Sequence, residues 1–153
     1  MSNLTWRDRL ARARSEEGSA IIEFIFLGVL MLVPLVYLVM ALARIQAGSY
    51  AVTTAAREAG RAYVTTTTGQ DATSRARAAA DIAFIDQGFS GMGSLEVSCS
   101  TSPCLTPGAR IETTARVTVP LPLIPAFARD VVPLEIPLSA SHLSTVDRFR
   151  GAP

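Results

Sequence analysis

The chain has 153 residues and a formal net charge of +1, from 14 basic and 13 acidic side chains, so we expect no general attraction to nucleic acid. Its single histidine, His142, excludes a catalytic or metal site built on several histidines. The sequence contains neither the glycine-flanked serine of a hydrolase nor a phosphate-binding loop with its lysine. We therefore expect no enzyme activity, no cofactor, no metal and no small-molecule substrate.

The N-terminal part of the chain predicts a membrane anchor. Residues 1–18 form a polar leader with four arginines, and residues 24–43 follow as an apolar span of 20 uncharged residues. At about 1.5 Å per residue, a helix of this length crosses the roughly 30 Å hydrocarbon core of a bilayer. Signal peptides have shorter apolar runs, of about 7–15 residues. Cleavage after Ala43 or Ala47, which would release an exported soluble domain, is the weaker alternative.

The charges on either side of the apolar span predict its orientation. Positively charged side chains near a span favour the cytoplasmic side, and the four arginines of the leader outnumber Arg44, Arg57 and Arg61 after it. We therefore expect a cytoplasmic N-terminus, with membrane lipid as the first partner and the rest of the chain outside the cytoplasm. Pro34, in the middle of the span, removes one helical hydrogen bond and predicts a kink.

The helical pattern continues beyond the span. Residues 44–64 are rich in alanine and contain no proline, and their apolar side chains recur at spacings of three and four. We therefore predict one helix over residues 19–64. After the break at residues 65–70, a second helix is predicted over residues 72–87, with Asp71 or Thr73 as its N-cap and Gly88 as its stop.

Alternation of apolar and polar residues then predicts strands. It is found at residues 95–99, 109–121 and 134–146, and Pro137 marks the last of these as an edge strand or a bulge. The fold class is therefore α+β: a long N-terminal helix, a second helix and a small antiparallel sheet of three strands. Residues 65–153 form the domain outside the membrane.

The two cysteines, Cys99 and Cys104, flank the connection between the first two predicted strands. A structural zinc site needs four ligands, and these two have no companions. A local disulfide is the interpretation that suits an oxidising compartment. A pair of free thiols is the alternative.

Glu23 is the one charged residue between the leader and the end of the apolar span. A carboxylate at the edge of a membrane segment either remains hydrated among the lipid headgroups or has a functional role. It is the fifth residue after Gly18, with Ser19 between them and Phe24 following. This spacing resembles the signal of type IV pilin-like proteins, in which a prepilin peptidase cuts after a glycine and a glutamate is the fifth residue of the mature chain.

A longer stretch, residues 16–63, points to a more specific family: "EEGSAIIEFIFLGVLMLVPLVYLVMALARIQAGSYAVTTAAREAGRAY". This stretch is similar to the conserved block of TadE-like proteins: a Gly-Ser start, a Glu-Phe pair, an apolar run containing proline and an alanine-rich helix. Such proteins are minor pseudopilins of the bacterial Tad (Flp) pilus system. The resemblance implies a pilin-like fold, cleavage between Gly18 and Ser19, and an assembly contact at Glu23 and Phe24.

The same resemblance implies the partners and the location. They are a prepilin peptidase, other pilins and pseudopilins, and the pilus assembly proteins of the bacterial inner membrane, with the C-terminal domain in the periplasm or outside the cell. The alternative from another class is an uncleaved single-pass membrane protein whose outer domain binds a partner.

Overall fold

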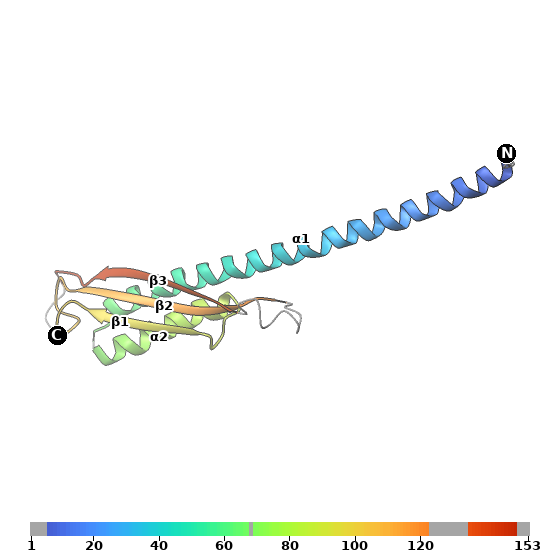
Figure 1. Ribbon diagram of the computed structural model, residues 1–153. Coiled ribbons are helices and arrows are strands. Elements are labelled where there is room, and N and C mark those ends of the chain that lie inside the picture. The colour runs from blue at the N-terminus through green and yellow to red at the C-terminus, as the bar shows by residue number, and fades with distance from the viewer. Residues whose placement is uncertain (1–5, 68, 123–134, 150–153) are drawn as a thin grey trace. The chain divides into compact units, whose positions relative to one another are not determined.

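The computed structural model of the chain describes residues 6–67, 69–122 and 135–149. Contacts between residues divide the chain into two compact units, Met1–Met40 and Ala41–Pro153; we call the second the folded unit. This α+β layout confirms the predicted order of two helices and three strands (Figure 1). The elements are α1 (Trp6–Val64), α2 (Gly69–Asp86), β1 (Gly93–Cys99), β2 (Arg110–Pro120) and β3 (Glu135–Thr145).

Helix α1 begins at Trp6, well before the predicted start at residue 19. The leader is helical because arginine, alanine, leucine and glutamate dominate it and it contains no proline. The prediction relied on apolar periodicity, which the leader lacks. The helix ends at Val64, as predicted, before a run of β-branched threonines. There the hydroxyl of Thr66 donates to the carbonyl of Ala62 over 2.7 Å, which satisfies one of the last helical acceptors.

Helix α2 begins at Gly69 and ends at Asp86, within a few residues of the predicted 72–87. Its C-terminus is closed as a Schellman motif. The amide of Gly88 donates to the carbonyl of Ile85 over 2.9 Å, and the amide of Phe89 donates to that of Phe84 over 2.8 Å. Gly88 has a φ of 76°, which a glycine adopts at little cost. The predicted stop at Gly88 is therefore confirmed.

The three strands form one antiparallel sheet in the order β1-β2-β3. Thr113 of β2 pairs with Val97 of β1 and with His142 of β3. Pro137 pairs with Thr118 without a shift in register. The proline is tolerated because β3 is an edge strand, so the edge interpretation is confirmed and there is no bulge at this position.

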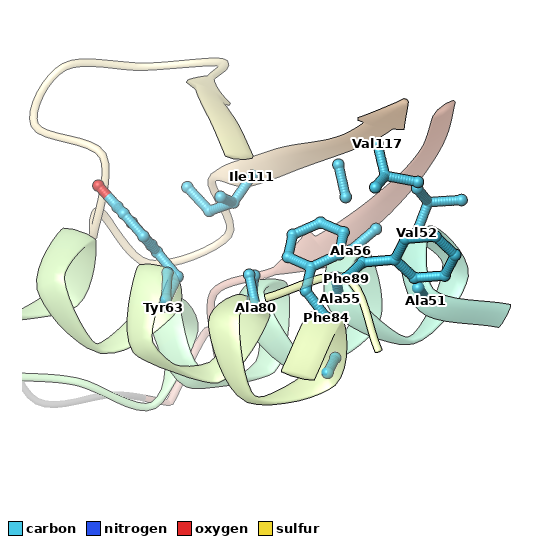
Figure 2. Close-up of a cluster of buried hydrophobic side chains, with 14 of the residues drawn as sticks. Ala51, Val52, Ala55, Ala56, Tyr63, Ala80, Phe84, Phe89, Ile111 and Val117 are labelled. Carbon is cyan, nitrogen blue, oxygen red and sulfur yellow. The ribbon is translucent and has the colours of Figure 1, made fainter. Parts of the chain in front are cut away.

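Both helical segments of the folded unit pack on one face of this sheet, which gives two layers (Figure 2). The hydroxyl of Thr113, fully buried, donates to the carbonyl of Ala56 in α1 over 2.7 Å. The helices contribute mainly alanines to the core, with Tyr63 and Phe84 as the large exceptions. The side chains of β2 that face the helices are Ile111, Thr113, Ala115, Val117 and Val119.

Close approach of α1 to the sheet requires glycine at position 48. A Cβ atom built on Gly48 would overlap the side chains of Val119 and Leu138 and come to 3.7 Å from Phe89. All three neighbours belong to the folded unit, and Val119 and Phe89 are fully buried. Core side chains therefore already occupy the space beside Gly48, and a larger residue at this position must displace them.

We predict that Gly48→Val lowers the free energy of unfolding by about 1–3 kcal/mol, because overpacking forces core side chains out of their rotamers. The matched control is Ser49→Val, which adds the same side chain at the next, exposed position of α1. Thermal unfolding of the full chain in detergent, followed by circular dichroism, measures both. Equal midpoints for the two variants would contradict the packing described.

Candidate functional site: the apolar helix and its boundary

The N-terminal half of α1 carries an apolar surface that the protein itself does not cover. The large apolar side chains from Phe24 to Leu42 are 43–77% exposed, apart from the half-buried Tyr37. The helix is long and apolar enough to cross a membrane, and none of its most apolar window is buried. Exposed to water, this much apolar surface is unfavourable by roughly 25 cal/mol per Å². A bilayer removes that cost, so the segment is compatible with a membrane anchor.

The residues predicted at the cleavage site and the assembly contact all lie on this helix. Gly18 and Ser19 are within α1, and Ser19 and Glu23 are exposed. Because they are four residues apart, Ser19 and Glu23 lie on the same helix face, one turn from each other. Phe24 is 77% exposed. Among the side chains that the structure describes, none forms an ion pair or hydrogen bond with Glu23.

Pro34 lies inside α1 without ending it. Since proline has no amide hydrogen, the carbonyl of Leu30 loses its usual helical donor. The same two residues belong to a shallow apolar depression on one side of the helix, together with Phe26, Val29 and Val33. This surface suits lipid chains or another apolar helix rather than a polar ligand.

Arg44 is the first charged residue after the apolar span, and it is half-buried in the folded unit. Its guanidinium lies over the ring of Phe89, 5.1 Å from the centroid, at the distance of a cation–π contact. Sequence analysis did not identify this contact, because it joins residues that are far apart in the chain. The one local signal is Gly88, which predicts that α2 ends immediately before Phe89.

Cys99 and Cys104 form a disulfide with a Cα–Cα distance of 5.4 Å. It closes part of the connection between β1 and β2, and the Tyr63 hydroxyl lies 4.0 Å from the sulfur of Cys99. Both cysteines pack against the core cluster. The disulfide therefore closes the first part of the β1–β2 connection, beside the Tyr63 hydroxyl of α1.

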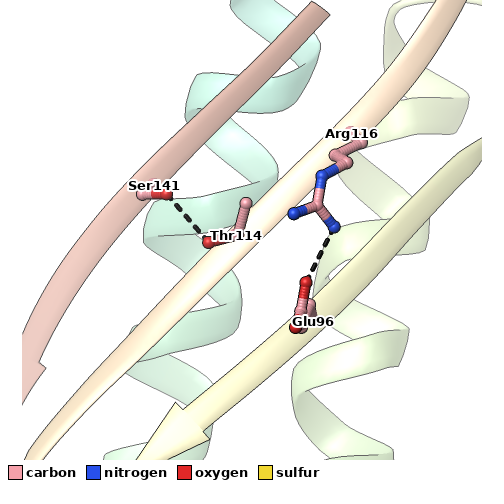
Figure 3. A network of polar contacts seen from close by, with 4 residues as sticks. All are labelled: Glu96, Thr114, Arg116 and Ser141. Carbon is pink, nitrogen blue, oxygen red and sulfur yellow. Dashed lines mark hydrogen bonds and ion pairs between the residues drawn. The ribbon is translucent and has the colours of Figure 1, made fainter.

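The outer face of the sheet, away from the helices, is polar (Figure 3). Arg116 and Glu96 form an ion pair of 2.8 Å with side chains 55% and 64% exposed, and the hydroxyls of Thr114 and Ser141 are 2.8 Å apart. At this exposure an ion pair contributes little to stability. In the part of the chain that the structure describes, no group of three or more His, Cys, Asp or Glu side chains is placed to hold a metal ion.

Comparison with protein families, with curated proteins and with solved structures finds no match for this chain.

We predict that the double variant Cys99→Ser with Cys104→Ser lowers the free energy of unfolding by about 2 kcal/mol, because a short covalent loop no longer restricts the unfolded chain. Chemical unfolding of the full chain in detergent measures the change. Reductant should lower the midpoint of the wild type and leave the double variant unchanged. A wild-type midpoint that does not respond to reductant would contradict the stabilising role.

Proposed function

We propose that this chain is a TadE-like minor pseudopilin, a structural subunit that assembles in a bacterial Tad (Flp) pilus system. The observation that carries the proposal is the position of Glu23. It is the one charged residue between Gly18 and Arg44, and it lies at the start of an exposed apolar helix that continues into a folded α+β unit. An exposed apolar helix of this length suits a subunit that is held in lipid before assembly, and a carboxylate at its edge is a candidate for the assembly contact.

The proposed chemistry begins with cleavage by a prepilin peptidase between Gly18 and Ser19. Cleavage removes the leader and creates an amine at Ser19, which is positively charged at neutral pH. In lipid, both this amine and the Glu23 carboxylate are costly unless they are paired. The amine of one subunit pairs with Glu23 of its neighbour, which fixes the register between adjacent helices. This pairing contributes to the specificity of assembly rather than to its stability, because the desolvation of both charges opposes their attraction.

The proposed topology follows from the arginines of the leader, which hold the N-terminus in the cytoplasm before cleavage. Residues 24–43 span the inner membrane, and residues 65–153 lie in the periplasm or outside the cell. Partners are the membrane lipid, the prepilin peptidase, other pilins and pseudopilins, and the assembly proteins of the inner membrane. An oxidising compartment outside the cytoplasm also suits the Cys99–Cys104 disulfide.

One observation favours the second candidate, an uncleaved single-pass protein with an outer binding domain. Helix α1 runs without a break from Trp6 through Gly18 and Ser19. The carbonyl groups at the cleavage site are therefore engaged in helical hydrogen bonds, and the helix must open there before a peptidase can act. Glycine makes this opening easier by about 1 kcal/mol relative to alanine.

Release of a soluble domain by cleavage after Ala43 or Ala47 is less compatible with the packing. The folded unit begins at Ala41, so both cuts would fall inside it. A cut after Ala47 would remove Arg44 and its contact with Phe89.

We predict that Glu23→Gln abolishes assembly without preventing membrane insertion, because glutamine keeps the size of the side chain and loses its charge. The matched control is Glu17→Gln, which removes a carboxylate on the leader side of the cleavage site. Each variant replaces the wild-type gene in its host. Pili per cell are counted by electron microscopy, and the membrane level of the protein is followed by immunoblot.

Loss of pili with Glu23→Gln alone, at an unchanged membrane level, is the expected result. If Glu23→Gln gave wild-type numbers of pili, the Glu23 carboxylate would have no role in assembly. It would then be a hydrated residue at the level of the lipid headgroups.

A further inference from the structure

Strand β1 forms an edge of the sheet whose outward backbone groups have no partner among the described residues. On its inner side, the amide of Ser100 donates to the carbonyl of Arg110 over 2.9 Å. Backbone groups along a strand point alternately to its two sides. The even-numbered residues of β1 therefore face β2, whereas the amides and carbonyls of Leu95 and Val97 point outward. We call these outward groups the β1 edge. No bulge interrupts it, because residues 93–99 pair with β2 one to one.

The opposite edge of the sheet, on β3, is protected against further pairing. The amide of Val146 donates to the carbonyl of Ala109, so by the same alternation the backbone of Pro137 points away from β2. Prolines at such positions discourage the addition of another strand. Strand β1 contains no proline, and its one charged residue, Glu96, already pairs with Arg116 of β2. The β1 edge is therefore the one that can accept a strand.

The helix layer reaches farther than the sheet on the side of β1. Cβ atoms built on Gly48 and Gly60 would each meet side chains of both β2 and β3, so α1 lies across these two strands. Helix α2 lies behind β1 (Figure 3), where the ring of Phe84 fills the space beside Gly93. Neighbouring strands are about 4.8 Å apart, and packed helices are about 8–10 Å apart. The axis of α2 therefore lies at or beyond the outer side of β1.

The side chains of β1 that face the helices are only partly covered. Leu95 and Val97 pack against the core and remain half-exposed, whereas Ile111 and Ala115 on the same face of β2 are fully buried. The side chains on the other face of β1 are exposed. A strand added at the β1 edge would cover Leu95 and Val97 if it turned apolar side chains toward α2 and polar side chains toward solvent.

We propose that the β1 edge binds an extended segment of another subunit of the pilus assembly, which joins the sheet as its fourth strand. The inference rests on the proposed function. A row of outward backbone donors and acceptors is complemented by an extended polypeptide, and side chains at alternate positions supply specificity. The bound segment has apolar side chains at every second position, facing α2.

A second copy of the whole sheet does not fit at the β1 edge. With its helices on the same face, those helices would overlap α2, since packed helices need about 8–10 Å between their axes. With its helices on the opposite face, it would turn its polar surface toward α2. The partner is therefore a segment without a helix layer of its own, such as an extended tail or loop.

The test removes an outward backbone donor from the β1 edge. Val97→Pro deletes the amide hydrogen and leaves the ladder with β2 intact, because that amide does not face β2. The matched control is Ser139→Pro, which removes an outward amide from the other edge of the sheet. Each variant replaces the wild-type gene in the host. Pili per cell are counted by electron microscopy, membrane levels are followed by immunoblot, and thermal midpoints of the full chains are measured in detergent.

We expect Val97→Pro to lose pili at an unchanged membrane level, with a thermal midpoint equal to that of Ser139→Pro, which keeps its pili. If Val97→Pro gave wild-type numbers of pili while Glu23→Gln abolished them, strand addition would be overturned and the proposed function would stand. If neither variant changed the number of pili, both would be overturned.

Amide hydrogen exchange of the wild type decides the matter if Val97→Pro proves unstable. The exchange is compared between the full chain in detergent and the same chain in pili isolated from the host. The amides of Leu95 and Val97 should change from fast to slow exchange on assembly, while those of Ser139 and Ser141 stay fast. Fast exchange of Leu95 and Val97 in the pili would overturn strand addition alone, and absence of the chain from the pili would contradict the proposed function as well.

Discussion

The rest of the structure depends on one constraint: a single helix carries an exposed apolar surface long enough to cross a membrane and, farther along the chain, a face that packs against a sheet. Between Phe24 and Leu42 its side chains are large, apolar and exposed, which suits lipid, where the helix satisfies its own backbone groups. From Gly48 to Gly60 the inward face consists of glycine, alanine and one valine, which lets the sheet come close. Within a few turns, the side chains of the same helix therefore change from large and exposed to small and closely packed. The Thr113 hydroxyl, bonded to the Ala56 carbonyl, fixes that packing at its centre.

Much of the fold could be predicted because its signals are local. The apolar alternation in β2 and the stop at Gly88 depend on neighbouring residues, and both were predicted. The start of α1 at Trp6 was missed, because the leader is helical through intrinsic propensity and has no apolar stripe. The contact of Arg44 with Phe89 and the close approach at Gly48 were also missed. They join residues that are distant in the chain, and a single sequence carries no record of such pairs.

The candidate site could be predicted in part. The sequence alone placed Gly18, Ser19, Glu23 and Phe24 in one segment, and the structure puts Ser19 and Glu23 on one face of α1, a turn apart. The proposed partner of Glu23 lies beyond a single chain, because an assembly contact forms only between subunits.

The central claim is that the leader is removed at Gly18 while the helix remains in the membrane. The most direct measurement is intact-mass spectrometry with N-terminal sequencing of the protein from membranes of its native host, with Gly18→Ala analysed alongside. The account predicts a mature chain that begins at Ser19 in the wild type and an uncut chain in the variant. A wild-type chain that keeps Met1 or Ser2, or one that begins at Arg44 or Gly48, would contradict it.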